Sequence, residues 1–174
     1  MRKVQYFSAI ATFALIAAML AMQLTGSAKT ISIKVDGSVF ISQSAEDAIR
    51  ALERLGYEPD KPSLESAPGQ MVYSKPSAQD VDPENLSFIR LSMQEGRVLE
   101  MSGRPEKISI GANSLVVGHA DAKEIKRILG PPNWERSVAN GAHGMCYENA
   151  KLYLEIVDGK LSGFSLGAVP AEMP

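Results

Sequence analysis

A set of short motifs occurs twice in this chain, in the same order. The tripeptide Ile-Ser-Ile at residues 31–33 recurs at residues 108–110, and at the same offset Asp-Gly at 36–37 corresponds to Asn-Ser at 113–114. Asp-Gly between alternating apolar residues is typical of a tight β-hairpin, and Asn-Ser is a weaker form of that signal. Each copy is therefore predicted to begin with two short strands.

A capped helix is predicted next in each copy. Ser44 is followed three residues later by Asp47, and Asp121 is followed in the same way by Glu124. Such a pair is a common helix start, because the two side chains satisfy free N–H groups of the first turn. Apolar residues at helical spacing come next, and a Leu-Gly pair ends both segments. Glycine is favoured there because it readily adopts the left-handed conformation that ends many helices.

The remainder of each copy is predicted to form strands. A Met-x-Tyr segment (Met-Cys-Tyr in the second copy), an alternating apolar segment, an acidic-Gly-basic turn and a second alternating segment occur in this order in both copies. Alternation of apolar and polar residues is typical of half-buried strands. These segments occupy residues 71–73, 89–93, 95–97 and 98–102 in the first copy and residues 145–147, 152–156, 158–160 and 161–165 in the second.

The repeated motifs predict an α+β fold of two tandem ββαβββ units, at about residues 31–103 and 108–167. Each unit would form a small antiparallel sheet with one helix packed on a face. A unit of about 70 residues buries little surface alone, so we expect the two units to pack together. The predicted domains are residues 29–103 and residues 104–174, the second with a short C-terminal tail.

The N-terminal residues have the three parts of a secretory signal peptide. The first residues are basic, residues 9–22 are almost entirely apolar, and small residues occupy 26–28. This arrangement predicts a cleavable signal peptide at residues 1–28 and a periplasmic protein. The alternative is a retained inner-membrane anchor, because residues 4–24 are nearly long enough to span a bilayer.

Composition excludes several classes of partner and cofactor. The chain has 18 Lys and Arg residues against 20 Asp and Glu residues, a formal net charge of −2. Nucleic-acid binding normally needs a clustered basic surface, so no nucleic-acid partner is expected. The single Cys excludes an internal disulfide and a thiolate-rich zinc site, and the chain has two His. We expect neither a cofactor nor a metal ion.

Two motifs have the form of catalytic sites, and both are better explained as strand residues. Gly-x-Ser-x-Gly at 163–167 matches the pattern around a hydrolase nucleophile, but that site needs a following helix and a later His. Only seven residues follow this motif, and none is His. Cys146 has His143 three residues away, yet it occupies the position of Val72 in the other copy, which predicts a buried strand residue. No enzymatic activity is predicted.

Two loops, at residues 76–85 and 131–144, interrupt the similarity between the copies. The second loop holds Trp134, the only Trp of the chain. Trp, Tyr and Arg dominate the binding energy of protein interfaces, so Trp134 is either an interface anchor or a residue that folds back on its own sheet. The predicted partner-binding residues are Trp134, Arg136, Asn140, His143, Asp80 and Asp82.

The second copy resembles a known family. Its helix, Leu-Gly-Pro-Pro at 129–132, Tyr147 and the strand pair around Asp-Gly-Lys at 158–160 resemble the SmpA/OmlA outer-membrane small-lipoprotein domain. The doubled plan is similar to beta-lactamase inhibitor proteins. The chain lacks a lipid-bearing Cys, and a hairpin stands where those families usually have another helix. Both resemblances imply an exported protein that binds other proteins.

The expected function is therefore to bind and neutralise a partner protein without catalysis. The partner would be a toxin or an enzyme that acts in the periplasm, and the chain would be its inhibitor or immunity protein. The alternative is an accessory factor of outer-membrane or envelope assembly, and a third interpretation is an enzyme without a recognisable motif.

Overall fold

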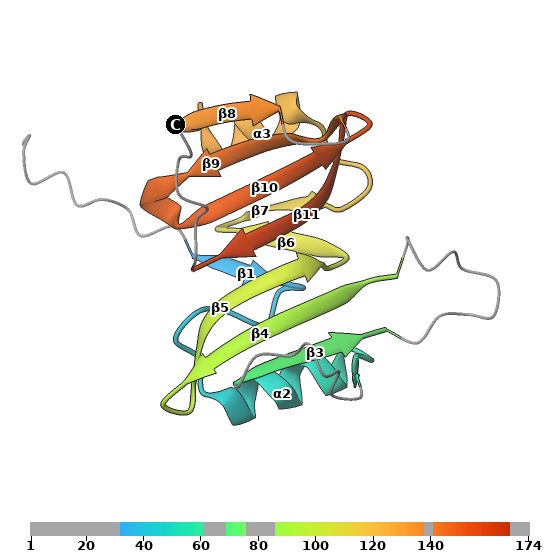
Figure 1. Cartoon of the computed structure of the whole chain (residues 1–174), viewed down its shortest axis with the longest axis vertical. Helices are drawn as coiled ribbons and strands as arrows, with labels where there is room; N and C mark the ends of the chain where they lie inside the picture. The colour runs from blue at the N-terminus through green and yellow to red at the C-terminus, as the bar shows by residue number, and fades with distance from the viewer. Residues whose placement is uncertain (1–31, 61–68, 76–85, 138–140, 168–174) are drawn as a thin grey trace, which may run out of the picture. The chain divides into compact units, whose positions relative to one another are not determined.

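Two antiparallel sheets and two α-helices make up the part of the chain that the computed structural model describes, residues 32–60, 69–75, 86–137 and 141–167 (Figure 1). The α+β class predicted from the sequence is confirmed. The predicted signal peptide and the acidic loop with Asp80 and Asp82 lie outside the described residues, as does Asn140. The described residues all belong to one compact structural unit.

The larger sheet has eight strands in the order β2-β3-β4-β5-β11-β10-β9-β8 among the described residues. The central pair, β5 and β11, joins strands from the two halves of the chain. Their register places Phe164 opposite Gly103, Ser165 opposite Ser102 and Leu166 opposite Met101. In sheet order the strands are Glu58–Pro59, Gln70–Ser74, Phe88–Gln94, Arg97–Arg104, Lys160–Leu166, Leu152–Val157, His143–Tyr147 and Trp134–Ser137.

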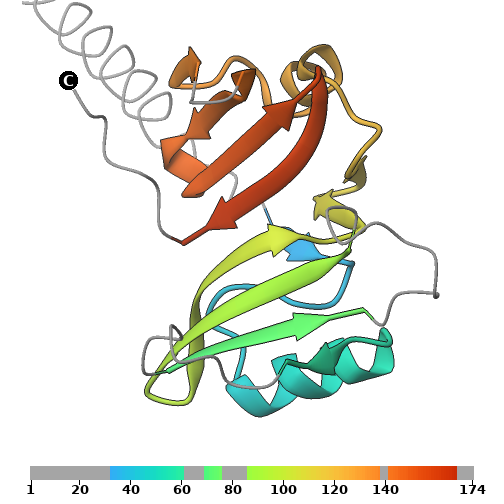
Figure 2. The same ribbon diagram turned by 45° about the vertical axis from the view of Figure 1, so that its right-hand side comes forward.

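The smaller sheet and both helices lie on one face of the larger sheet (Figures 1 and 2). The small sheet contains β1 (Ile33–Val35), β6 (Lys107–Ile110) and β7 (Asn113–Val116), with β6 in the middle. The helices are α2 (Ala45–Arg54) and α3 (Ala122–Leu129). A short 3₁₀ turn, η3, spans Glu148–Ala150 between β9 and β10. Neither of the described helices is long and apolar enough to cross a membrane.

Both helices begin where the sequence predicts. The Ser44 hydroxyl accepts a hydrogen bond from the Asp47 N–H at 3.1 Å, and the Asp121 carboxylate accepts one from the Glu124 N–H at 2.9 Å. These bonds satisfy donors that the first helical turn cannot pair by itself. The glycine that ends the second helix, Gly130, has φ +83°, which L-residues with a side chain rarely adopt. The local helix signals are thus confirmed.

The core lies between the large sheet and the elements on its helix side. Alternate strand residues project into it, because successive side chains of a strand point to opposite faces. On β4, for example, Ile89 and Leu91 are fully buried whereas Arg90 between them is exposed. The helices and the small sheet supply the other side of the core, with Ala48, Leu52, Ile108, Leu115 and Ile125 among its fully buried residues.

The prediction of a separate sheet in each half of the chain is wrong. The edges of the two sets of strands pair through β5 and β11, which satisfies backbone groups that an exposed edge would leave open. The first strand, β1, pairs with β6 of the other half rather than with strands of its own half. The second strand predicted for the first copy, after Asp-Gly at 36–37, is reduced to a single bridge between Val35 and Val39. Two short strands that the sequence did not predict, β2 and β8, extend the large sheet at its ends.

Candidate functional site

The face of the large sheet away from the helices, here called the open face, is where partly exposed side chains from several strands meet. Residues opposite each other on neighbouring antiparallel strands project to the same side of a sheet. The observed register therefore defines one row of side chains that crosses six strands of this face. From β8 to β4 the row consists of Trp134, Cys146, Tyr153, Ser165, Ser102 and Arg90.

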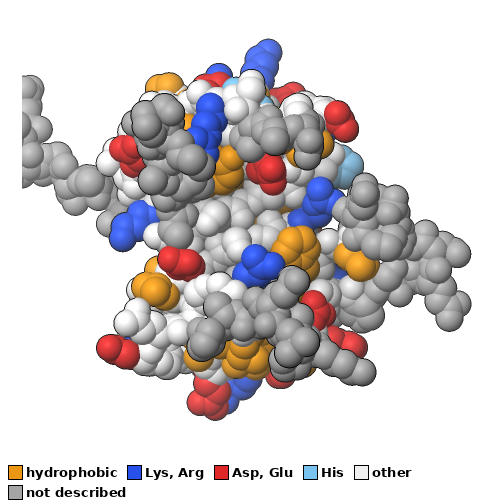
Figure 3. Space-filling model, in the orientation of Figure 1, with side chains coloured by type: hydrophobic (Ala, Val, Ile, Leu, Met, Phe, Trp, Pro, Cys, Tyr) orange, Lys and Arg blue, Asp and Glu red, His pale blue; other side chains and the backbone are white. Residues whose placement is uncertain are grey.

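A hollow of about 630 Å³ lies on the open face where the two halves of the sheet join. Its lining includes the small residues Ser102, Gly163 and Ser165, and the aromatic side chains of Phe88 and Tyr153. The middle of this face is mostly white backbone and small polar side chains in Figure 3, with basic and hydrophobic side chains beside them. Small residues between larger aromatic ones leave room for a side chain of another molecule.

Charged side chains also line this hollow. Arg90, Arg104 and Glu155 contribute to its walls. The Arg104 guanidinium donates a hydrogen bond from Nε to the Ser162 carbonyl at 2.9 Å, which fixes its direction across the sheet. Arg90 is exposed, and within the described part of the chain it forms no hydrogen bond or ion pair through its side chain. The hollow therefore presents two guanidinium groups and one carboxylate.

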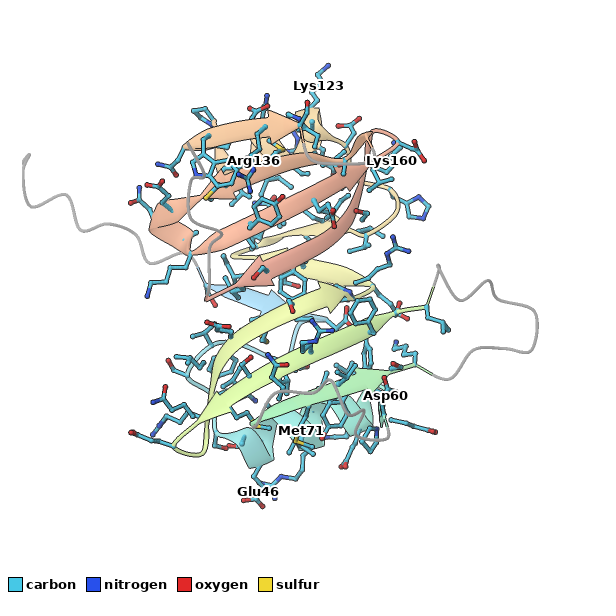
Figure 4. All side chains as sticks on the ribbon, viewed as in Figure 1. Glu46, Asp60, Met71, Lys123, Arg136 and Lys160 are labelled. Atoms are coloured by element: carbon cyan, nitrogen blue, oxygen red, sulfur yellow. The ribbon has the colours of Figure 1, made fainter. Side chains whose placement is uncertain are left out.

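Trp134, Arg136 and Tyr153 form a packed group beside the hollow, here called the Trp–Arg–Tyr cluster. The Trp134 and Tyr153 rings are 5.9 Å apart between centroids and tilted by 44°. The Arg136 guanidinium carbon lies 5.0 Å from the centroid of the Trp134 ring, within the range of a cation–π contact. Figure 4 shows Arg136 lying over the large sheet. All three side chains are half-buried, so they lie on their own sheet and still reach solvent.

Gly144 provides the space that the cluster needs. It lies opposite Arg136 on β9, and a Cβ atom there would stand 2.4 Å from the Tyr153 hydroxyl oxygen and 2.9 Å from its Cζ. The Tyr153 ring therefore covers the bare backbone of Gly144. Burial, and then the nearby Glu155 carboxylate, raise the pKa of the Tyr153 hydroxyl, whereas Arg136 lowers it. The phenol thus stays neutral and able to donate a hydrogen bond.

Cys146 is buried, as the sequence predicts, but not in the main core. Its side chain has no exposed surface, and its register places it between Trp134 and Tyr153 on the open face. It is absent from the group of buried residues that pack beneath the helices. We conclude that the aromatic side chains of the cluster shield the thiol.

His143 is separated from the other predicted contact residues. Strand alternation places it on the helix side of the sheet, opposite Ile156, whereas Trp134 and Arg136 face the open side. Its Nε2 atom lies 3.0 Å from one oxygen of Glu135, and Lys126 Nζ of α3 lies 2.7 Å from the other. Lys126 first, and His143 second, hold the pKa of the Glu135 carboxyl below its usual range.

The structure thus brings together two of the six predicted contact residues, Trp134 and Arg136. His143 lies on the opposite face, and the remaining three lie outside the described residues. Sequence reasoning missed Phe88, Arg90 and Tyr153 because it looked for function in loops. Arg90 and Tyr153 lie at outward positions of segments whose strand alternation was recognised, and Phe88 directly precedes one of these segments. The alternation therefore already indicated which side chains point outward.

The two catalytic-type motifs do not assemble a site among the described residues. Ser165 lies within β11, opposite Ser102 and Tyr153, rather than at a turn between a strand and a helix. Cys146 and His143 project to opposite faces of β9, so the imidazole does not approach the thiol. No three His, Cys, Asp or Glu side chains of the described residues gather in a way that could hold a metal ion.

Comparison with protein-family models, curated proteins and solved structures finds no match to this chain.

Proposed function

We propose that this chain is an exported, non-enzymatic protein that binds and neutralises another protein through the open face of its large sheet. The observation that carries the proposal is the Trp–Arg–Tyr cluster beside a hollow, on a sheet face that no described element covers. Such a partner would be a toxin or an enzyme acting in the periplasm, for which this chain serves as immunity protein or inhibitor.

The residue types on the open face favour a protein as the ligand. Trp, Tyr and Arg are the side chains that most often provide the binding energy of protein interfaces. Here one of each is held in a rigid group, which lowers the entropy lost when a partner orders them. The adjoining hollow, flanked by Phe88 and Tyr153, would receive a side chain from the partner.

Charge on this face favours an acidic partner surface. Arg90, Arg104 and Arg136 all belong to it, and Glu155 and Glu100 are carboxylates of the same face. Arg90 has no partner among the described residues, so a carboxylate from another protein would complete its hydrogen bonding. Complementary charge of this kind speeds association and excludes partners of the wrong sign.

The architecture we propose is a duplicated ββαβββ unit whose strands join into one sheet. Two β-bulges support it. The pairing of β4 with β5 shifts between Ser92 and Met93, and the pairing of β10 with β11 shifts between Glu155 and Ile156. These positions are 63 residues apart, the same offset that relates the two strand pairs in the sequence. This plan is what the resemblance to beta-lactamase inhibitor proteins and small-lipoprotein domains implies.

Partner capture on the immobilised chain from residue 29 onward tests the proposal. An extract of the periplasm and envelope of the source organism is passed over the wild-type chain and over Trp134→Ala and Arg136→Ala. Each substitution should weaken capture about 30-fold, the effect of losing ~2 kcal/mol of binding free energy. Arg50→Ala, which changes an exposed ion-pairing residue of α2, should capture as wild type does.

The outcomes separate the candidate functions. A soluble toxin or enzyme that is captured only by an intact open face supports neutralisation, and its activity should fall when the chain is added. Capture of an integral outer-membrane complex would instead support a role in envelope assembly. Binding that survives both open-face substitutions would show that this face is not the contact surface.

A further inference from the structure

The strand that carries two of the open-face residues, β8, is short and lies at one end of the large sheet. β8 has four residues and lies at the end of the sheet, so β9 is its only described strand neighbour. Trp134 and Arg136 point to the open face from this strand, and Glu135 between them points to the helix side. The contacts of Glu135 therefore act on the same short strand that carries both open-face side chains.

Glu135 connects three elements through its two carboxylate oxygens. Oε1 lies 2.7 Å from Lys126 Nζ of α3, and Oε2 lies 3.0 Å from His143 Nε2 of β9. The side chain is about one-third exposed, with a relative exposure of 30%. A carboxylate that contacts two basic side chains at once is held more firmly than one in a single exposed ion pair, which is usually weak.

The other groups near this carboxylate are few. Tyr147 of β9 lies close enough for Glu135 to contribute to its raised pKa of about 12, after burial, so it stays neutral at physiological pH. On β10 the residue opposite His143 is the apolar Ile156. On α3 the remaining described ion pair joins Arg127 to Glu124 at 3.9 Å, within the helix itself. The one histidine that contacts Glu135 among the described residues is therefore His143.

We propose that Glu135 is a positioning residue for the Trp134 and Arg136 contact side chains, and that the proton on His143 sets how firmly it holds them. Its relevance to partner binding rests on the proposed function, but the positioning itself can be measured without a partner. The consequence is a binding surface that is more rigid at mildly acidic pH than at alkaline pH.

The direction of the pH effect follows from the charges. Glu135 remains ionised from pH 5 to pH 8, because its pKa is lowered by Lys126 and His143. A histidine side chain carries its positive charge only when protonated, and imidazoles exchange that proton within this range. Without that proton the ion pair on Oε2 is lost, whereas the Lys126 pair remains. β8 should then move more freely.

Trp134 reports this movement directly because it is the only Trp of the chain. Acrylamide quenching of Trp fluorescence, excited at 295 nm, is measured from pH 5 to pH 8 on the full chain. We expect the quenching constant to rise about twofold across this range, the effect of one half-exposed ion pair on an open–closed equilibrium. His143→Gln should remove the pH dependence, and Glu135→Gln should give high quenching at every pH.

Two matched controls isolate the effect. His119→Gln changes the other His of the chain, and Glu124→Gln breaks an ion pair of α3 that does not reach β8. Both should keep the wild-type pH profile. Circular dichroism checks that each variant is folded. If Glu135→Gln does not fold, Lys126→Gln replaces it, and this variant should show raised quenching at every pH together with a pH dependence that persists.

The proposal is overturned if His143→Gln retains the wild-type profile, or if Glu135→Gln, or Lys126→Gln in its place, leaves Trp134 quenching unchanged. Neither result depends on a binding partner. A pH-dependent Trp134 signal without partner capture would contradict the proposed function alone, and partner capture with a pH-independent signal would contradict this inference alone.

Discussion

In the interior, hydrogen bonds to a buried carboxylate join residues from both halves of the chain. The Tyr57 hydroxyl donates a 2.6 Å hydrogen bond to one oxygen of Asp36, and the Lys107 N–H donates to the other at 2.8 Å. Asp36 is 6% exposed and Tyr57 is 2% exposed. A buried carboxylate is costly unless its oxygens are paired, so this aspartate depends on both donors.

Removal of the Tyr57 hydroxyl tests that dependence. Tyr57→Phe keeps the ring in place but leaves one oxygen of Asp36 without its donor, which should lower the free energy of unfolding by about 1–3 kcal/mol. Urea denaturation followed by circular dichroism measures the change. Tyr73→Phe is the matched control, because Tyr73 is equally buried and its hydroxyl has no hydrogen-bond partner among the described residues. Equal losses in both variants would assign the effect to the removal of any buried tyrosine hydroxyl rather than to the bond with Asp36.

At the residue scale, the sequence predicted whether a side chain is buried better than it predicted which face of the sheet the side chain points to. The correspondence of Cys146 with Val72 predicts an apolar strand position, and the burial of Cys146 confirms it. The same comparison does not show which side of the strand the thiol occupies, because that depends on pairing with strands elsewhere in the chain. His143, an odd number of positions from Cys146, points to the opposite side for the same reason.

At the element scale, the packing of side chains across β8, β9 and β10 depends on Gly144. Gly144→Ala places a Cβ atom 2.4 Å from the Tyr153 hydroxyl oxygen, so the ring must leave its position over β9. The expected cost is about 1–3 kcal/mol of stability from overpacking. The Trp134 emission maximum should shift and Cys146 should react faster with iodoacetamide, because Tyr153 no longer shields either side chain.

Gly163→Ala provides the control for this prediction. Gly163 also lies within a strand on the open face, but a Cβ atom there would meet its nearest neighbours at 3.4 Å, an ordinary contact distance. Its effect on stability and on Cys146 alkylation should be small. If Gly144→Ala left the Trp134 emission and the thiol reactivity unchanged, the assignment of Tyr153 as the cover of this region would be wrong.

Local signals explain which elements the sequence could predict. Both helices follow from a capping residue, a nearby acidic residue and apolar spacing, all within about a dozen positions. The pairing of β5 with β11 has no such signal, because each strand alternates correctly whether it ends a small sheet or continues a larger one. The sequence therefore predicts most of the strands, and the tertiary structure decides which of their edges pair.

At the scale of the whole molecule, the two halves of the chain share both sheets, because each half contributes strands to the small sheet and to the large one. β1 comes from the first half, and its strand partner β6 belongs to the second. The Asp36 backbone and side chain both bond to the Lys107 backbone, and β5 pairs with β11 across the middle of the large sheet. Each half by itself would therefore lack partners for a strand in both sheets.

Because the two halves share both sheets, we predict that neither half folds alone. A chain of residues 29–104 would lose the described strand partner of β1 and one of the two partners of β5. A chain of residues 105–174 would lose one of the two partners of β6 and of β11. Fragments of this length bury too little surface to offset such a loss. Each should show no cooperative thermal transition by circular dichroism, whereas the intact chain should unfold in one step and an equimolar mixture should regain structure. A cooperative transition in either isolated fragment would mean that the halves are independent domains, because the shared strands would then contribute little to the stability of each.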